Sequence, residues 1–188
     1  ARSVQEIRSA GPSQDGDGVA IQRITGMQHA AMDPILMLDE LRAERREDLG
    51  GGFPPHPHRG MQTLTYMKHG GIIHEDSRGE IRSGGVQWMS AGRGIIHSEM
   101  PTLDTQGLHG FQLWINLPAG EKMGEPRYRD IPAETLTRSE GDGFTALTIA
   151  GDWQLGAIAS RGPLQELAPR AGLVDVTLQP GATLELPV

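Results

Sequence analysis

Glycine and proline interrupt this chain so often that long helices are excluded and short strands joined by turns are favoured. The 188 residues include 26 glycines and 13 prolines, which together make about a fifth of the chain. No segment sustains the 3.6-residue apolar period that an amphipathic helix requires. The sequence therefore predicts an all-β fold, an antiparallel sandwich or small barrel.

Individual strands are predicted from local patterns. The alternation of apolar and polar residues, or short apolar runs between glycines, predicts strands at 19–24, 61–69, 110–118 and 144–151. Residues 72–80 are interpreted as a short strand and a turn, and residues 86–101 as a strand, a glycine turn and a second strand. A dense apolar run after Asp33 predicts a turn and a buried strand that ends at Asp39 and Glu40. Residues 126–132 are interpreted as a connector. On 110–118, Phe111 and Leu113 are expected to share one face.

Two short motifs offer pairs of side chains that can bind a metal. His56 and His58 lie in GGGFPPHPHRG, and His97 and Glu99 follow 41 positions later in GRGIIHSEM. Side chains two apart in a strand point to the same face. Two such pairs on facing strands could converge on one ion with three imidazoles and one carboxylate. The prolines around His56 exclude a regular central strand and favour an edge strand or a strand entry.

These donors suit several metals. The chain has no cysteine, so nitrogen and oxygen ligands favour Fe, Mn, Ni, Cu, Zn or Co over ions that require sulfur. A His-x-His motif also occurs in ordinary strands. On the pattern alone, metal binding and a structural role are both open.

Other polar and aromatic residues have two interpretations each. The group His74, Glu75 and Asp76 is expected to shape a hairpin turn rather than to form a second acid–base site. His69 is expected to be a solvated turn residue. Phe53, Trp88 and Met89 could line a substrate pocket or pack in the core. Arg59 and Arg93 could hold an anionic ligand or donate structural hydrogen bonds beside glycine turns. His29 and His109 have no partner pattern.

Composition and charge restrict the partners. The net charge of −7 disfavours direct nucleic-acid binding, which depends on phosphate contacts. The basic run Arg42–Arg46 is interrupted by Glu44 and is interpreted as a solvated face. No signal-peptide pattern or membrane-length apolar run occurs. We therefore expect no membrane partner and a cytoplasmic location, which the absence of cysteine fits.

The longer motifs resemble those of the pirin family of the cupin superfamily. The similarity extends from Asp33 to Ile131 and rests on FPPHPHRG, GGIIHEDSRG, VQWMSAGRGIIHSEMP, FQLWINLPA and KMGEPRYRDI. This resemblance implies a cupin-type β-barrel and one divalent transition metal, with Fe²⁺ expected first. It assigns His56, His58, His97 and Glu99 as the ligands. General cupins carry a carboxylate ligand where this chain has Gln62, so Glu99 is the one charged ligand of the set.

The resemblance also implies two alternative functions. One is a quercetinase-like dioxygenase that acts on a flavonol-like substrate with O₂, in which Glu99 binds the metal and takes the substrate hydroxyl proton. The other is a non-enzymatic regulatory protein, a transcription cofactor or a modulator of a metabolic enzyme, that binds a protein partner. A deep cavity that reaches the metal would favour the enzyme.

Two domains are expected. Residues 1–145 are assigned to an N-terminal metal-binding cupin domain, and residues 146–188 to the start of a second, incomplete cupin-like domain. Within the second, Gly172–Val188 is interpreted as an opening hairpin with a Pro-Gly turn. An open sheet edge there would need to be covered by a partner or a second copy.

Overall fold

The computed structural model describes residues 7–25, 27, 30–75 and 79–186. The chain divides into two compact units, of which one spans Arg8–Ala133 and the other begins at Glu134. The first unit contains every residue proposed above as a metal ligand. Each unit is described by itself.

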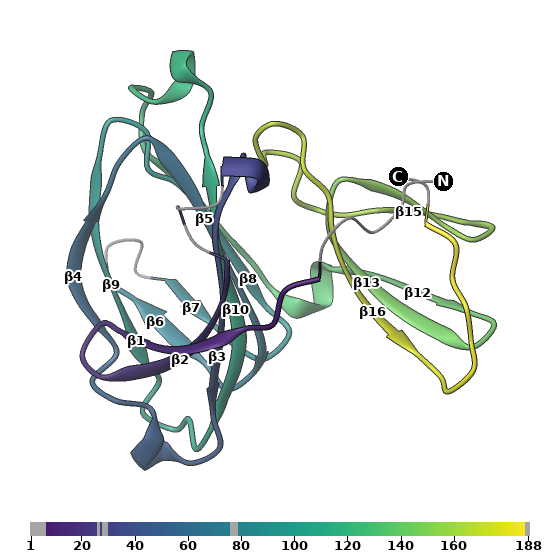
Figure 1. The fold of residues 1–188 in the computed structure, drawn as a ribbon, viewed down its shortest axis with the longest axis horizontal. Coiled ribbons are helices and arrows are strands. Elements are labelled where there is room, and N and C mark those ends of the chain that lie inside the picture. Colours follow the sequence, from purple (N-terminus) through teal and green to yellow (C-terminus); the bar gives the residue numbers. More distant parts are fainter. Residues whose placement is uncertain (1–6, 26, 28–29, 76–78, 187–188) are drawn as a thin grey trace. The chain divides into compact units, whose positions relative to one another are not determined.

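The first unit consists of two antiparallel sheets that curve around a shared interior (Figure 1). The larger sheet has the order β1 (Gly11–Asp15), β2 (Val19–Thr25), β3 (Ile35–Ala43), β10 (Leu108–Asn116), β5 (Met61–His69), β8 (Val86–Ser90) and β11 (Arg127–Ile131). The smaller sheet has the order β4 (Phe53–His58), β9 (Ile95–Pro101), β6 (Ile72–His74) and β7 (Gly79–Ile81).

Helical structure in the described residues is restricted to short 3₁₀ segments. They are η1 (Ala30–Met32), η2 (Arg46–Asp48), η3 (Ala119–Glu121) and η4 (Ala133–Thr135). No helix in this part of the chain has the length and apolar character needed to cross a membrane. The prediction of an antiparallel, all-β fold is confirmed.

The apolar core of this unit lies between the two sheets. Its central cluster combines residues of β2, β3, β5, β6 and β10 with Leu49, which follows η2; the strand residues are Val19, Ile21, Leu41, Met67, Ile72 and Leu108. Phe53, the first residue of β4, packs against it. This packing ties the start of β4, the strand that carries two of the histidines, to the core.

Strand β3 is longer than predicted. It continues through Asp39 and Glu40 to Ala43, so the strand end predicted at these acidic residues is wrong. The Asp39 carboxylate is buried but accepts two hydrogen bonds from Arg23, at 2.8 and 2.6 Å. Because Arg23 lies opposite Asp39 in the β2–β3 register, the negative charge of Asp39 is compensated by a cation on the neighbouring strand.

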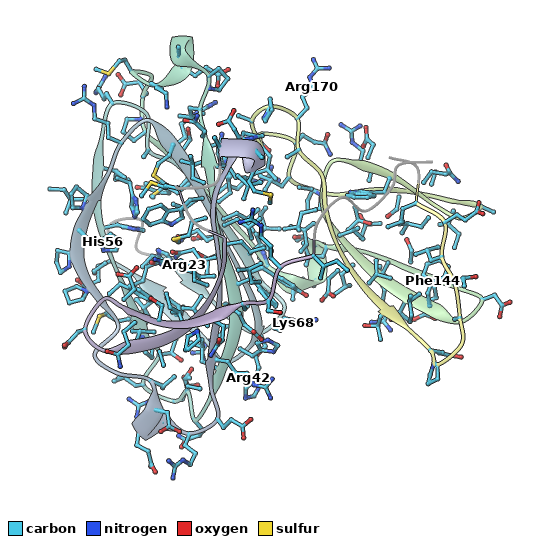
Figure 2. The ribbon with its side chains drawn as sticks, viewed as in Figure 1. Arg23, Arg42, His56, Lys68, Phe144 and Arg170 are labelled. Atoms are coloured by element: carbon cyan, nitrogen blue, oxygen red, sulfur yellow. The ribbon has the colours of Figure 1, made fainter. Side chains whose placement is uncertain are left out.

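Arg23→Ala is expected to lower the free energy of unfolding by about 2–3 kcal/mol, because it leaves the buried Asp39 carboxylate without its cation. Urea denaturation measures the effect. Arg42, labelled with Arg23 in Figure 2, is the matched control. It pairs with Glu44 at the surface, so Arg42→Ala should change the same quantity by less than about 0.5 kcal/mol. Equal losses in the two variants would contradict this interpretation of the buried pair.

One further strand prediction is wrong. Residues 127–131, interpreted as part of a connector, form β11 and pair with β8. On β10, Gln112 is buried whereas Phe111 and Leu113 are partly exposed, so the polar residue faces the interior. Phe111 and Leu113 share one face of the strand, as predicted, and Gln112 on the other face has buried polar partners, described below.

The second unit is a smaller set of strands. β12 (Thr137–Gly141), β13 (Phe144–Ala150) and β16 (Leu173–Leu178) form one sheet, and β14 (Asp152–Leu155) pairs with β15 (Ile158–Arg161). Phe144, Ala146 and Leu155 form its buried cluster. The predicted hairpin after residue 172 is present only in its first arm, because no strand follows β16 in the described residues. The assignment to an incomplete cupin-like domain stays a prediction.

Candidate metal centre

Strand β4 carries the first two histidines at the edge of the smaller sheet. Its prolines cannot donate ladder hydrogen bonds, and an edge strand is where they are tolerated. His56 is half-buried and His58 is buried, while Pro55 and Pro57 are exposed. The alternation therefore turns both imidazoles to the inner face, as the spacing predicts.

Strand β9 brings His97 to the same place from the neighbouring position in the sheet. His97 is the direct cross-strand partner of His56. Glu99, two residues further, is the cross-strand partner of His74 on β6. All three side chains of this inner row, His97, Glu99 and His74, are at most 3% exposed. β9 thus lies at the centre of a row of titratable groups.

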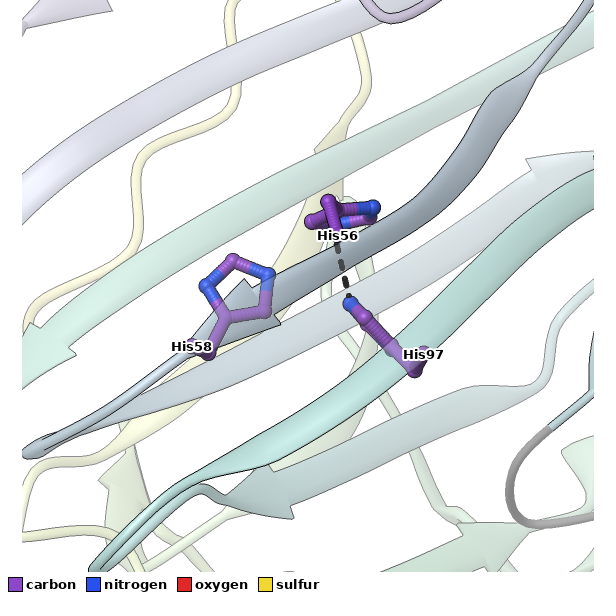
Figure 3. Close-up of side chains that lie close together, drawn as sticks. All are labelled: His56, His58 and His97. Carbon is purple, nitrogen blue, oxygen red and sulfur yellow. Dashed lines mark hydrogen bonds between the residues drawn. The ribbon is translucent and has the colours of Figure 1, made fainter.

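The three predicted histidines converge (Figure 3). One nitrogen from each of His56, His58 and His97 can be chosen so that all lie within 4.8 Å of one another. The Nε2 atoms of His56 and His97 are 3.0 Å apart. Their ring centroids are separated by 4.5 to 4.9 Å.

These histidines fit a metal ion. His56 Nδ1 lies 2.8 Å from the carbonyl oxygen of Pro54, and a carbonyl can only accept, so Nδ1 carries the proton and Nε2 presents a lone pair. A carbonyl partner on the other ring nitrogen is typical of a metal-binding imidazole. Two nitrogens each about 2.1 Å from one ion and at right angles to each other are about 3 Å apart, which matches the Nε2 separation of His56 and His97.

Glu99 lies beside this cluster and has its own polar partners. Gln112 Nε2 donates to both carboxylate oxygens at 3.0 Å, and Thr65 Oγ1 donates to Oε1 at 3.4 Å. His74 Nε2 is 3.4 Å from the same oxygen. No carboxylate oxygen of Glu99 belongs to the group of candidate ligand atoms that lie within 4.8 Å of one another. The structure therefore brings three of the four predicted ligands together, and the role of Glu99 as a ligand stays a proposal.

Burial lowers the pKa of two of the clustered histidines. The pKa of His58 falls from 6.5 to about 4, because burial disfavours the imidazolium and a protonated His56 would repel it. The pKa of His97 also falls to about 4, chiefly because of burial, although Glu99 acts in the opposite direction. Both rings are therefore neutral near pH 7, the form that can bind a metal.

The metal-free protein is expected to lose stability as the pH falls from about 6.5 to 4. In that interval His58 and His97 are protonated in the unfolded chain but stay neutral in the folded protein. The free energy of unfolding therefore decreases as the pH falls, by up to roughly 3 kcal/mol for each histidine. Chemical denaturation at pH 7 and pH 4.5 measures the change. His58→Leu should make the pH dependence shallower, whereas an unchanged dependence would contradict the assignment.

A cavity of about 550 Å³ opens next to the cluster and is within the size range of small-molecule sites. Its wall is formed by Asp15, Gly16, Asp17, Phe53, Pro54, Pro55, His56, Gln112 and Trp114. It therefore combines aromatic and proline surfaces with one of the clustered histidines. Another cavity, in the apolar core, has a volume of only about 20 Å³, too small for an organic ligand.

The glycine run before β4 shapes one wall of the larger cavity. Gly51 N donates to Asp17 O at 2.7 Å, and Asp17 N donates to Gly52 O at 2.8 Å. A Cβ on Gly51 would overlap the Asp17 carboxylate. At Gly50, φ is +63° and a Cβ would lie 2.8 Å from backbone atoms of Asp17 and Gly18, so glycine at this position lets the β1–β2 turn approach the start of β4.

Most of the other residues considered from sequence are buried in the core or paired with a neighbouring side chain. Trp88 and Met89 are buried in the core, and Arg93 pairs with Glu125. His109, for which the sequence showed no partner, lies 2.9 Å from Glu40. His69 is exposed, as predicted. Arg59 Nη2 contacts Met123 Sδ at 3.2 Å, Gln62 is buried on β5, and His29 and Asp76 lie outside the described residues.

Sequence reasoning missed His74 and Gln112. His74, expected to shape a turn, is the last residue of β6 and is fully buried beside Glu99. Gln112 lay in an apolar strand pattern and was not considered. The signal that could have identified His74 is its position two residues after Ile72 in a strand, which places it on the same inner face as that core residue.

An antiparallel sandwich with clustered histidines on its inner face defines a cupin-class protein, and the comparisons with known proteins agree. A family model described as Pirin matches residues 18–115. A Vibrio cholerae protein named "Putative quercetin 2,3-dioxygenase" is 45% identical over 189 residues, covering 98% of this chain and 67% of that protein. Human "Pirin" is 38% identical over 179 residues, covering 93% and 58%. The crystal structure of quercetin 2,3-dioxygenase from Acinetobacter baumannii aligns with a TM-score of 0.72 at 27% identity, covering 86% and 59%.

The chain belongs to the pirin family. The resemblance stated from its motifs is thereby confirmed, and so is the cupin fold. The chain spans about two thirds of the length of the Vibrio relative and less than two thirds of human Pirin. What those longer proteins do as a whole is therefore carried over only as a proposal.

Proposed function

We propose that this protein is a metal-dependent dioxygenase that acts on a flavonol-like substrate with O₂, at a centre formed by His56, His58, His97 and Glu99. The observation that carries the proposal is the cavity of about 550 Å³ that has His56 in its wall. The names of the Vibrio protein, "Putative quercetin 2,3-dioxygenase", and of the Acinetobacter protein, quercetin 2,3-dioxygenase, suggest the reaction class and the substrate class.

The cavity wall suits a flat aromatic substrate. Phe53 and Trp114 offer aromatic surfaces, and Pro54 and Pro55 offer rigid apolar ones. An aromatic ring buried between such surfaces gains from area burial and from ring–ring contacts. Asp17 on the cavity wall is a potential hydrogen-bond acceptor for phenolic hydroxyls. The substrate would bind with its hydroxy-ketone end toward His56.

The ligand set defines what an ion would contribute there. Fe²⁺ is the ion proposed first, and Mn, Ni, Cu, Zn or Co fit the same nitrogen and oxygen donors. When bound, such an ion supplies Lewis-acid stabilisation of an ionised substrate hydroxyl and, where it is redox-active, electron transfer toward O₂. The chain's own contribution is the neutral imidazoles, which orient the centre, and the Glu99 carboxylate, which accepts the substrate hydroxyl proton.

The cavity also bears on the two functions expected from sequence. A regulatory protein with a purely structural ion needs no space beside its ligands. A cavity of substrate size bordered by a proposed ligand favours the enzyme. Binding of a protein partner is compatible with the enzyme and is not required by any feature of the centre.

Turnover of quercetin under ¹⁸O₂ by the Fe²⁺-reconstituted protein tests the proposal. A dioxygenase places both atoms of O₂ in the products, so O₂ uptake should equal substrate loss and both labels should be recovered. His56→Ala should abolish uptake, because it removes a ligand that also borders the cavity. Metal-loaded protein that consumes no O₂ with flavonols would overturn the proposal and favour the regulatory function.

A further inference from the structure

His74 is the most deeply buried of the described histidines, with 1% of its surface exposed. It ends β6, directly opposite Glu99 in the β6–β9 register. Neither of its ring nitrogens has a hydrogen-bond partner in the part of the chain that the structure describes. A polar side chain this deeply buried requires an explanation.

An unpartnered histidine at this position is costly for the fold alone. A neutral imidazole always carries one N–H, and a buried donor without an acceptor costs about 1–3 kcal/mol. A leucine would fill a similar volume without that cost. The stability of the fold therefore does not explain a histidine at position 74.

The neighbours of His74 belong to the proposed metal centre. Its Nε2 is 3.4 Å from Glu99 Oε1, and its ring centroid is 5.6 Å from that of His97. On the other side of the carboxylate, Gln112 donates to both oxygens at 3.0 Å. Trp114 Nε1 donates to Gln112 Oε1 at 3.2 Å, which turns the amide nitrogen toward Glu99. The Glu99 carboxylate is thus flanked by Gln112 and His74.

We propose that His74 is a positioning residue of this centre, whose Nε2–H donates to Glu99 Oε1 and, together with Gln112, fixes the carboxylate for its role at the ion. The separation of 3.4 Å is slightly longer than the usual N–H···O distance, so the proposed contact requires a small movement of the ring toward Glu99. The inference rests on the proposed function, because it concerns the same metal centre.

Two variants separate a positioning role from a structural one. His74→Leu removes both nitrogens, and His74→Gln keeps a side-chain N–H that can reach Glu99. The melting temperature of the metal-free proteins, their Kd for Co²⁺ and the visible spectrum of the Co²⁺-loaded proteins are measured. The spectrum reports the ligands around the ion, so a purely structural residue would not change it.

His74→Leu is expected to melt no more than about 2 °C below the wild type, because leucine fills a similar volume and Glu99 keeps its hydrogen bonds from Gln112. Its Kd for Co²⁺ should nevertheless weaken about 10- to 100-fold, with an altered spectrum. His74→Gln should recover most of the affinity and the wild-type spectrum.

His109 provides the matched control, because it also lies beside a carboxylate, Glu40 at 2.9 Å, but on the opposite face of β10 from Gln112. His109→Leu should leave the Kd and the spectrum unchanged. A His74→Leu protein with a lower melting temperature but wild-type Kd and spectrum would overturn the positioning role alone. A wild-type protein that binds no Co²⁺ would overturn the proposed function as well.

Discussion

Replacing His97 with alanine is expected to weaken metal binding at least about 100-fold, equivalent to about 2.7 kcal/mol. His97 lies on the central strand of the ligand row, opposite His56, and its Nε2 is 3.0 Å from that of His56. Its removal takes away one of three clustered nitrogens and leaves two imidazoles, both on the edge strand β4. Preorganised ligands account for much of the affinity of a protein metal site, so the loss should be large.

Competition with a chromogenic chelator measures the affinity. His69→Ala is the control, because His69 is an exposed imidazole at the end of β5, and it should bind the ion as the wild type does. If His97→Ala retains wild-type affinity, the ion does not bind at the three-histidine cluster.

Glu99→Gln is expected to reduce O₂ uptake with quercetin by a factor of about 100 or more, because a positioned proton acceptor commonly contributes 10²–10⁴-fold. The substitution nearly preserves the shape of the side chain and removes its charge. Glu99 is 2% exposed and accepts two hydrogen bonds from Gln112, so no solvent group can replace the lost carboxylate.

Initial rates on protein with measured metal content separate loss of catalysis from loss of the ion. Glu40→Gln is the matched control, since Glu40 pairs with His109 on β3 and β10, away from the cluster. That variant should turn over at the wild-type rate. Full activity of metal-loaded Glu99→Gln would exclude Glu99 as the proton acceptor.

The sequence predicted the elements whose pattern is local. Glycine turns and alternation located most strands, and the prolines around His56 correctly indicated an edge strand. The spacing of the histidines predicted their shared face, because side-chain direction in a strand depends only on parity. Convergence of His97 with the β4 pair also required the β4–β9 register, which no local pattern specifies.

The failed predictions at Asp39 and His74 involve polar residues whose partners are distant in sequence. Asp39 looked like a strand end until Arg23 was found opposite it. Gln112 was not considered from sequence, yet it donates to Glu99 and accepts from Trp114. His74 looked like part of a turn, yet it faces Glu99 across β6 and β9. A buried polar residue is explained by its partner, and strand pairing determines that partner.

The most direct test of the metal centre is anomalous diffraction at the iron edge from crystals loaded anaerobically with Fe²⁺. The account predicts one strong peak per chain, within bonding distance of nitrogens from His56, His58 and His97, with Glu99 as the carboxylate ligand. A peak bound by other residues, or no peak in this cluster at full loading, would contradict it.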